Sequence, residues 1–235
     1  MTAVVVPGIL QASKAVARGA HLKDSSMSET TVRSRRNLMA ILRGVEPDGA
    51  IEIGEALVAG GIGLIGVARN SPDAFESVAR LSKALTGRAE IGGGMVTGID
   101  QIADLMDAGG RFAVAPNTDA YVIEVARSRS LKTYPGVFTA TEAFAAIEAG
   151  ADALNLYPAF LLGAAGIKAL KAALPAQVPL WAIGGVTAAD LADYTVAGCG
   201  GFGLGSGLYE PGMPAVEVQA NAEAYSKAYD AAFGI

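Results

Sequence analysis

The sequence predicts an α/β fold, a single (β/α)8 barrel of the TIM type. From Leu38 onward, short apolar runs alternate with stretches of helical period, as is typical of βα units around a parallel sheet. Eight such units in roughly 200 residues match a small barrel. A doubly wound sheet is the other candidate. It is disfavoured because no G-x-G-x-x-G follows the first run and the Gly-rich turns come late in the chain.

The expected strands are short runs bounded by Gly, Pro or charged residues. In chain order they are LMAILRG, GIGLIGVA, AEIGGGM, RFAVAP, LKTYPG, DALNLYP, PLWAIGG and GFGLGS, at residues 38–44, 61–68, 89–95, 111–116, 131–136, 152–158, 179–185 and 201–206. Their apolar character on both faces fits strands of a parallel barrel, which are covered by helices outside and packed inside.

The expected helices have polar starts and Gly at or near several of their ends, as helix capping requires. The clearest are PDGAIEIGEALVAGG at 47–61, TATEAFAAIEAG at 139–150 and TAADLADYTVAG at 187–198. The last stretch, AVEVQANAEAYSKAYDAAF at 215–233, should be the helix that closes the barrel.

The chain divides into a barrel domain and an N-terminal extension. With 235 residues, 51% of them hydrophobic, it can bury one sizeable core, which we assign to residues 37–235. Residues 1–36 are basic, low in aromatics and rich in Ser and Thr, so we expect them to be disordered or a fused or docking peptide. Met27, followed by SETTVRSRR, is typical of a start, which would make residues 1–26 an upstream extension, fusion or tag.

Composition argues against several classes of partner. A net charge of −5 and scattered basic residues give no footprint for nucleic acid. No apolar run reaches the roughly 18 residues of a membrane helix, so we expect a cytoplasmic protein. Cys199 has no second cysteine to pair with, and His21 is the only histidine. The usual zinc ligand sets are therefore missing, and we expect neither a metal nor a cofactor.

Two Gly-rich turns predict a phosphate site at the carboxyl end of the barrel. The seventh strand ends at Gly184 and Gly185, and the eighth ends at Gly205 and Ser206. Barrel enzymes commonly hold phosphate after strands seven and eight, where glycine lets backbone N–H groups approach an anion. Each turn alone is also consistent with simple turn chemistry, but the two together favour phosphate.

Arg43 ends the first strand, in ILRG. At the barrel mouth its guanidinium could bind a carboxylate through two parallel hydrogen bonds, and the alternative is a salt bridge on the rim. With the Gly-rich turns, it predicts a ligand carrying a carboxylate at one end and a phosphate at the other.

Several longer motifs run through the barrel from about Leu38 to the C-terminus. They are AILRGVEPDGA, NSPDAFESVARL, YPGVFTATEAFAAIEAGADAL, IKALKAALP, AIGGVTAADLADYTVAGCGGFGLGSGLY and AYDAAF. Together they resemble the bacterial 2-dehydro-3-deoxy-6-phosphogalactonate (KDPGal) aldolases, kin of the phosphogluconate (KDPG) aldolases. The resemblance implies a homotrimeric class I aldolase that cleaves a phosphorylated keto acid to pyruvate and glyceraldehyde 3-phosphate through a lysine Schiff base. It also implies that Arg43 binds the pyruvate carboxylate and that the two Gly-rich turns hold the phosphate.

The chain departs from the family pattern at the positions that perform the chemistry. The family's ALKLFP, with the Schiff-base lysine, is ALNLYP here, which places Asn155 at the nucleophile's position. The family's VEVPLNSP, with the proton-transferring glutamate, is IGVARNSP, which places Gly66 at the base's position. An amide nitrogen is not nucleophilic, and glycine transfers no proton, so we expect the class I mechanism to be lost.

Other departures also map to the expected mouth. GAGTV is GGGMV here, exchanging a threonine that touches the keto acid for Met95; Arg69 replaces a Leu, Ala115 a small hydroxyl residue and Tyr157 a Phe. With Asn155, this lining favours an anionic or polar aromatic ligand. Because helices and turns keep the family pattern, we interpret the pocket as rewritten, either in a paralogue with another ligand or by design.

No other side chain is an obvious replacement for the lost lysine or glutamate. Lys168 and Lys171 fall on the outer face of the sixth helix, while Lys132 and Glu90 fall at the starts of strands, at the end of the barrel opposite the mouth. We interpret the lysines as solvated structural residues.

Three functions remain open at this point. The first is a family barrel that binds, or acts weakly on, a phosphorylated or carboxylated small molecule. The second is a non-catalytic trimeric scaffold with a docking peptide at residues 1–26. The third is an active aldolase that uses a different lysine.

Overall fold

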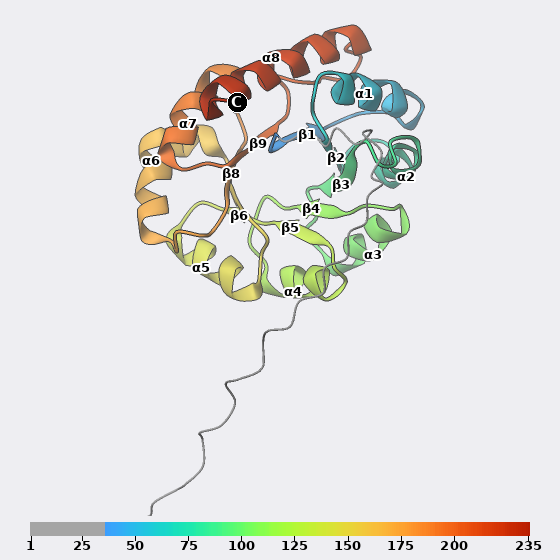
Figure 1. Cartoon of the computed structure of the whole chain (residues 1–235). Coiled ribbons are helices and arrows are strands. Elements are labelled where there is room, and N and C mark those ends of the chain that lie inside the picture. Colours follow the sequence, from blue (N-terminus) through green and yellow to red (C-terminus); the bar gives the residue numbers. More distant parts are fainter. Residues whose placement is uncertain (1–35) are drawn as a thin grey trace, which may run out of the picture. The chain divides into compact units, whose positions relative to one another are not determined.

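The computed structural model describes residues 36–235, which form a ring of parallel strands enclosed by helices (Figure 1). The predicted fold class is therefore confirmed. The expected extension lies almost wholly outside the described residues. The strands are β1 (Leu38–Leu42), β2 (Leu64–Ala68), β3 (Glu90–Gly94), β4 (Phe112–Val114), β5 (Lys132–Tyr134), β6 (Gly136–Val137), β7 (Leu154–Leu156), β8 (Leu180–Ile183) and β9 (Gly201–Leu204).

The sheet order is β5-β4-β3-β2-β1-β9-β8-β7-β6, with every pair parallel. Its two ends, β5 and β6, flank Pro135 in a single run of chain, so that run joins the ends and closes the barrel. The strand predicted at 131–136 is thus present but divided, because proline has no N–H to continue a ladder. Across the division, the N–H of Asn155 donates to the carbonyl of Pro135 at 2.9 Å.

Helices cover the outside of the barrel (Figure 1). They are α1 (Pro47–Ala59), α2 (Ala74–Ala84), α3 (Ile99–Asp107), α4 (Ala120–Ser128), α5 (Ala140–Ala149), α6 (Ala159–Ala173), the 3-10 turn η1 (Ala188–Asp190), α7 (Leu191–Ala197) and α8 (Ala215–Phe233). The last coincides with its predicted range. α6 is interrupted at Gly163, whose φ is 58°. Thr139 and Glu142 form a reciprocal capping box at the start of α5, and Gly150 ends that helix in the left-handed region.

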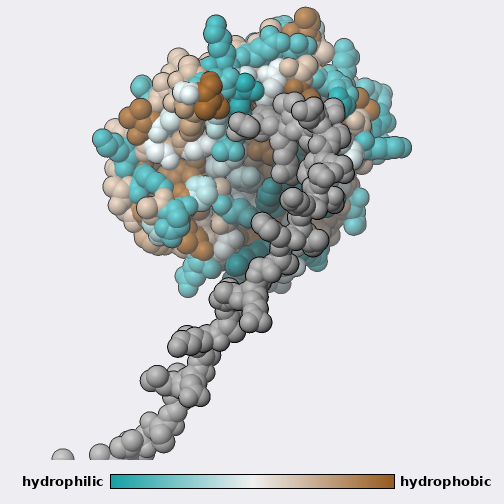
Figure 2. Space-filling model, in the orientation of Figure 1, coloured by the Kyte–Doolittle hydropathy of each residue, from teal (hydrophilic) through white to brown (hydrophobic). Residues whose placement is uncertain are grey.

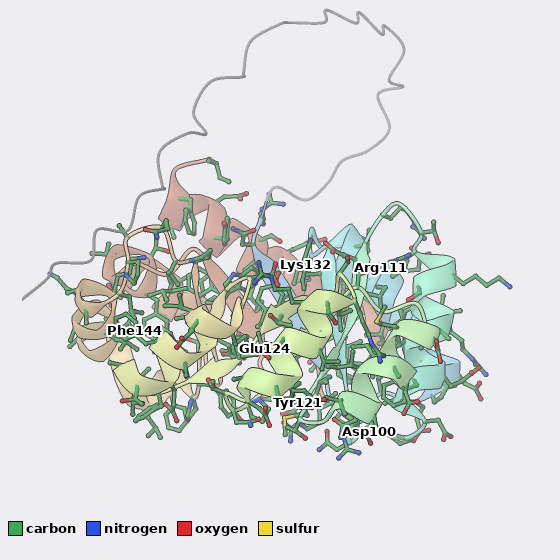
Figure 3. All side chains as sticks on the ribbon, turned by 90° about the horizontal axis from the view of Figure 1, so that it is seen from below. Asp100, Arg111, Tyr121, Glu124, Lys132 and Phe144 are labelled. Atoms are coloured by element: carbon green, nitrogen blue, oxygen red, sulfur yellow. The ribbon has the colours of Figure 1, made fainter. Side chains whose placement is uncertain are left out.

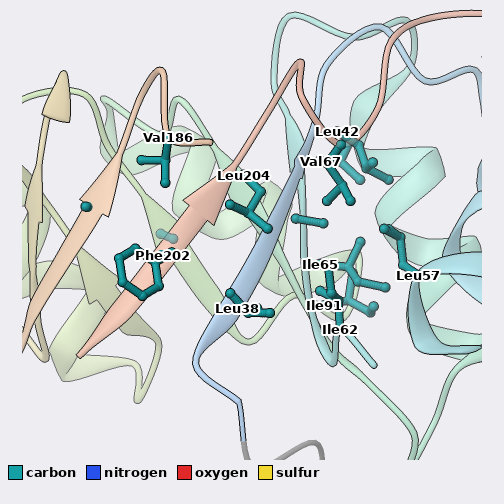
Figure 4. Packing of buried hydrophobic residues seen from close by; sticks show 14 of the residues in the cluster. Leu38, Leu42, Leu57, Ile62, Ile65, Val67, Ile91, Val186, Phe202 and Leu204 are labelled. Atoms are coloured by element: carbon teal, nitrogen blue, oxygen red, sulfur yellow. The ribbon is translucent and has the colours of Figure 1, made fainter. Parts of the chain in front are cut away.

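The main core lies between the strands and the helices. Alternate residues of each strand face outward, and around β1 and β2 these are Leu38, Leu42, Ile65 and Val67. Figure 4 shows them gathered with Leu57 of α1 in one apolar layer. This layer fixes the first helix against the barrel.

A second, smaller core fills the inside of the barrel. Phe112, Tyr134 and Trp181 form a column, with edge-to-face ring centroids 5.9 and 5.2 Å apart. Glycines on neighbouring strands make room for these rings, because a Cβ at Gly92 would overlap Phe112 and one at Gly201 would overlap Trp181. The barrel interior is therefore packed beneath its mouth.

The two ends of the barrel differ in the residues they carry. Figure 3 shows Arg111 and Lys132, which precede or begin strands, at one end, and Asp100 and Tyr121, from the first turns of α3 and α4, at the other. The second end, where strands finish and helices begin, is the mouth. Parallel barrels place their functional residues there.

The start of the barrel is fastened to its last helix. Arg36 forms a two-fold ion pair with Asp230 of α8, with both N–O distances 2.6 Å. The side-chain amide of Asn37 also donates to the carbonyl of Gly200 at 2.9 Å. These contacts join the first and last βα units.

The surface drawn in Figure 2 mixes hydrophilic and hydrophobic residues over the whole visible face. Among residues 36–235, none of the helices combines the length and apolar character that a membrane span requires.

Candidate functional site

A cavity of about 650 Å³ opens at the mouth of the barrel. Its wall comes from the ends of strands and the turns that follow them. It is lined by Ile41, Arg43, Gly94, Met95, Val114, Ala115, Pro116, Asn155, Tyr157, Ile183, Gly184, Gly185, Val186, Thr187, Gly203, Gly205, Ser206, Gly207, Tyr209, Glu210 and Pro211. Such a volume accommodates a small organic ligand.

The cavity brings together most of the residues that the sequence suggested for a site. These are Arg43, Met95, Ala115, Asn155, Tyr157, Gly184, Gly185, Gly205 and Ser206. They come from far apart in the chain and meet only because the barrel places all strand ends in one circle.

Two residues from the sequence analysis lie outside this wall. Gly66 is buried on the inward face of β2, where an added Cβ would lie 3.4 Å from Cε2 of Phe112. Arg69 is exposed after β2, and its backbone N–H donates to the carbonyl of Gly94 at 2.9 Å. Arg69 is therefore placed beside the cavity rather than in its lining.

Asn155 provides a buried amide in the cavity wall. It lies on β7 in register with Gly136 and Trp181, and its exposed fraction is 1%. Its Nδ2 donates to the carbonyl of Ala115 at 3.1 Å, whereas its Oδ1 has no hydrogen-bond partner in the described part of the chain. Buried polar atoms are nearly always paired, so this oxygen is an exception that requires an explanation.

The loop after β4 holds the acceptor for this amide in place. A Cβ at Gly136 would overlap the peptide between Pro116 and Asn117, so only glycine allows the loop to pack there. The N–H of Gly136 donates to the carbonyl of Asn117 at 3.2 Å. The carbonyl of Ala115, two residues earlier, is thereby held beside β7.

The turn after β8 presents backbone to the cavity. Gly184 and Gly185 have φ of 94° and 69°, in the left-handed region that favours glycine. A Cβ at Gly184 would crowd Tyr157 at 3.1 Å, and one at Gly185 would crowd Phe160 at 2.9 Å. The N–H of Gly185 is without a partner in residues 36–235, which leaves it available to an anion.

The turn after β9 lies on the same side of the cavity. An added Cβ at Gly205 would meet open space, and neither the N–H nor the hydroxyl of Ser206 is paired within the described residues. The N–H groups of Leu208 and Tyr209 donate to the carbonyl of Gly205 at 2.9 and 3.1 Å. This segment is a single hydrogen-bonded turn, and α8 begins only at Ala215, so the turn is not itself the start of a helix.

The mouth carries one cation and one anion. Arg43 follows β1 and Glu210 follows the turn after β9, and both are exposed. Their loops touch, since a Cβ at Gly44 would lie 2.7 Å from Cγ of Pro211. Neither charged group has an ion-pair partner in residues 36–235. Sequence reasoning missed Glu210, because its place after a Gly-rich barrel turn indicates the mouth without showing that it lines the cavity.

The cavity lining contains no lysine from the described residues. Lys132 pairs with Glu90 at 2.8 Å at the opposite end of the barrel (Figure 3). Lys171 donates to two carbonyls of the loop after α6, both at 2.9 Å, and Lys168 is exposed on α6. None of these amines has access to a ligand in the cavity.

Two other titratable groups are held in their neutral form. Burial raises the pKa of Tyr134, within the barrel column, to about 12, and it raises the pKa of the Cys199 thiol to about 12. Both therefore stay protonated near neutral pH. Residues 36–235 also contain no cluster of three or more His, Cys, Asp or Glu side chains suited to a metal ion.

One known protein family matches most of the chain. The KDPG and KHG aldolase family matches residues 29–222. The probable 2-dehydro-3-deoxy-6-phosphogalactonate aldolase of Rhizobium meliloti is 44% identical over 85% of this chain and 94% of its own length. The 2-dehydro-3-deoxy-6-phosphogalactonate aldolase of Escherichia coli K12 is 41% identical over 82% of this chain and 94% of its own length.

Two solved structures give the same result. One described as native KDPGal is 39% identical, covers 86% of this chain and 98% of its own, and has a TM-score of 0.84. A cube-shaped cage designed by fusing symmetric oligomeric domains is 40% identical, with a TM-score of 0.83. The match covers 85% of this chain and 74% of the cage chain. The chain therefore belongs to the KDPG and KHG aldolase family.

Proposed function

We propose that this family member binds a phosphorylated or carboxylated small molecule in the mouth cavity and does not perform the Schiff-base aldol reaction. The observation that carries the proposal is the amide of Asn155 in the wall of a cavity to which residues 36–235 contribute no lysine. An amide nitrogen has no basic lone pair and cannot form an imine.

The remaining groups suit an anionic ligand. Arg43 lines the cavity and forms no ion pair within residues 36–235, which supports a role in binding a carboxylate. The turns at Gly184–Gly185 and Gly205–Ser206 offer backbone N–H groups and a hydroxyl for a phosphate. Gly66 has no carboxylate with which to move a proton, and general acid–base assistance is typically worth about 10² to 10⁴-fold in rate.

The absence of imine chemistry can be tested directly. The full chain is incubated with pyruvate and borohydride and its mass is measured. We expect no adduct, and a stoichiometric adduct on a lysine peptide would show that a different lysine has taken over. A borohydride-free sample is the control for non-specific modification.

Ligand binding is tested by a thermal-shift screen of sugar phosphates and keto acids. A ligand at 100 times its dissociation constant stabilises the fold by about 2.7 kcal/mol. Arg43→Gln should weaken the binding of ligands that carry a carboxylate and leave the binding of ligands with phosphate alone unchanged. If the substitution weakens the binding of both kinds of ligand equally, the role assigned to Arg43 is wrong.

Assembly is a second candidate function, favoured by the cage-forming neighbour built from symmetric oligomeric domains. We infer a homotrimer, and the start of α6 offers the adjacent apolar side chains Phe160 and Leu161, which are 59% and 62% exposed. Light scattering should give three times the chain mass, and Leu161→Asp should lower it.

The proposed docking peptide at residues 1–26 lies outside the described residues. Deleting it should leave the trimer mass and the melting temperature unchanged. Loss of the trimer on truncation would assign these residues to assembly. Ligand binding without a partner protein favours the first function over the scaffold alternative.

A further inference from the structure

Met95 is held in a strained backbone conformation in the wall of the mouth cavity. Its φ is 62°, in the left-handed region that favours glycine and asparagine and is uncommon for a long apolar residue. Hydrogen bonds fix the chain on both sides of it. The carbonyl of Gly94 accepts from the N–H of Arg69 at 2.9 Å, and the N–H of Val96 donates to the carbonyl of Val114 at 3.0 Å. Strain that the surrounding structure enforces in this way is a reason to look for a function.

Packing in the protein interior does not explain why methionine occupies this position. The residue lines the cavity, is partly exposed, and belongs to neither of the two apolar cores formed by residues 36–235. A glycine would adopt the same backbone without strain. The side chain of Met95 therefore contributes to the cavity rather than to the core.

Met95 belongs to an apolar wall, which we define as Met95, Ala115 and Pro116, directly after β3 and β4. All three residues line the cavity and are partly exposed, so a ligand can contact them. The backbone of Ala115 is already paired. Its N–H donates to the carbonyl of Tyr134 at 3.1 Å, and its carbonyl accepts from Nδ2 of Asn155 at 3.1 Å. The wall therefore offers a ligand mainly hydrocarbon and a polarizable thioether.

The groups suited to anions lie on another arc of the mouth. Arg43 follows β1, Ser206 follows β9 and Gly185 follows β8, and these three strands are adjacent in the sheet. In the sheet order, β3, β2 and β1 separate β4 from β9, so the apolar wall lies across the mouth from the Gly-rich turns. A ligand that contacts Arg43 and these turns with its charged groups therefore turns its body towards the apolar wall.

Polar side chains on this side of the cavity are few. Among the described residues that line it after β3, β4 and β7 or on these strands, they are Asn155 and Tyr157. Asn155 is 1% exposed and its nitrogen is already paired. The phenol hydroxyl of Tyr157 remains, and one such group cannot pair with several ligand hydroxyls.

We propose that the ligand has a hydrocarbon body between its anionic groups, and that Met95 selects this body over a polyhydroxylated chain. The inference rests on the proposed function, namely that the cavity binds a phosphorylated or carboxylated small molecule. A hydroxyl against the apolar wall would lose its water without gaining a partner, which is unfavourable. Aliphatic or aromatic carbon instead gains contact with the thioether.

The test compares two ligands with the same charged ends. Both 6-phosphogluconate and 6-phosphonooxyhexanoate carry a carboxylate and a phosphate on an unbranched chain of equal length, but only the first has hydroxyls along the chain. Binding to the full chain is measured by titration calorimetry. We expect 6-phosphonooxyhexanoate to bind about tenfold more tightly, or better, because burying unpaired hydroxyls weakens binding.

Variants assign this preference to Met95. Met95→Gly and Met95→Asn both suit a positive φ, and each should reduce the affinity ratio of the two ligands to near one. Ser130→Gly is the matched control, because Ser130 has φ of 60° but is exposed after α4 and outside the cavity lining. Met95→Gly and Ser130→Gly should both raise the melting temperature by relieving strain, whereas Ser130→Gly should preserve the ratio.

The outcomes separate this inference from the proposed function. If both ligands bind and 6-phosphogluconate binds as tightly as 6-phosphonooxyhexanoate, the inference is wrong and the proposed function stands. The same holds if neither variant at position 95 changes the ratio. If neither ligand binds, the inference is wrong, and the thermal-shift screen alone decides on the proposed function. Two variants at position 95 keep the assignment testable if one of them does not fold.

Discussion

The side chain of Asn155 sits on β7 between glycine and tryptophan neighbours, in the wall of a cavity at the mouth of an aldolase-family barrel. At this position an amine would face the cavity from an apolar strand. Burial lowers the pKa of a lysine, which raises the fraction of neutral, nucleophilic amine.

Asn155→Lys should therefore restore imine formation with pyruvate, detected as a borohydride-trapped mass increase. Cleavage should remain slow, because Gly66 supplies no carboxylate for proton transfer. Adding Gly66→Glu should raise pyruvate release from 2-dehydro-3-deoxy-6-phosphogalactonate by about 10-fold or more over the single variant. Recovery stays partial because Met95 still lines the cavity.

The matched control is Gly66→Glu alone, which should trap no pyruvate. A Cβ at this position would lie 3.4 Å from Cε2 of Phe112, so the first carbon of the new side chain requires little adjustment of that ring. If the double variant is folded yet neither traps nor cleaves, Asn155 and Gly66 are not the nucleophile and base positions.

At the scale of elements, the run of chain containing β5, Pro135 and β6 both closes the barrel and supports the site. Its glycine, Gly136, lies against the peptide between Pro116 and Asn117, with no room for a side chain. The loop after β4 is therefore coupled to the strand beside Asn155.

Gly136→Ala should destabilise the fold by about 1–3 kcal/mol, because the new methyl group meets backbone that cannot yield easily. Gly49→Ala is the matched control. Gly49 lies in α1 with nothing within 4 Å of an added Cβ, so alanine there should stabilise by about 0.5–1 kcal/mol. Urea unfolding measures both, and equal effects from the two substitutions would contradict this account.

The capping box of α5 gives a second prediction at this scale. Thr139→Ala should lower the free energy of unfolding by about 1 kcal/mol, and Thr139→Ser should restore most of it. Hydrogen bonds from the N–H of Phe138 and from Thr139 lower the pKa of the Glu142 carboxyl. The stabilisation from Glu142 is therefore present at neutral pH and is lost as the pH falls below its unfolded value near 4.3.

Denaturation of Glu142→Gln across pH tests this sign. The free energy of unfolding of this variant should be lower than that of the unchanged protein at pH 7, and the difference should shrink towards pH 3. If this difference in the free energy of unfolding instead grows on acidification, the cause assigned to the lowered pKa is wrong.

The elements were predictable to the extent that local pattern determines them. Alternating apolar runs located every barrel strand, and α8 was located by its period. Pro135 was visible in the sequence, but its effect depends on the partner strands, which meet only when the barrel closes.

The site was predictable where family motifs or strand ends identify it, as for Arg43 and the two Gly-rich turns. Glu210 was missed because its position depends on how the loop after β9 folds back over the mouth. Arg69 was expected in the lining because it replaces a Leu of the family pattern, but it is exposed after β2 and is not among the residues that line the cavity. The unpaired Oδ1 of Asn155 could not be foreseen, since pairing depends on the exact position of the Ala115 carbonyl.

At the scale of the whole molecule, the ion pair between Arg36 and Asp230 joins the start of β1 to α8. Asp230→Asn should reduce stability by roughly 0.5–1 kcal/mol at pH 7, as expected for a partly exposed pair. The hydrogen bonds from Arg36 lower the pKa of Asp230, so the contribution is present above its unfolded value near 3.9 and lost as the pH falls.

Thermal unfolding of both proteins at pH 7 and pH 2.5 measures this difference. The melting temperatures should differ at pH 7 and converge at pH 2.5. The control is Asp104→Asn, which removes an acidic group for which no ion pair is seen in residues 36–235. It should leave the melting temperature nearly unchanged at both pH values.

The aromatic column inside the barrel gives the protein an intrinsic optical reporter. Trp181 is the only tryptophan of the chain, is 5% exposed, and stands in register with Asn155. Its indole emission should be shifted to short wavelength, as for any ring shielded from water, and should originate from a single known place. Because Asn155, its register neighbour, lines the cavity, we expect a ligand there to alter the indole emission, and binding can then be followed by fluorescence on the unlabelled chain.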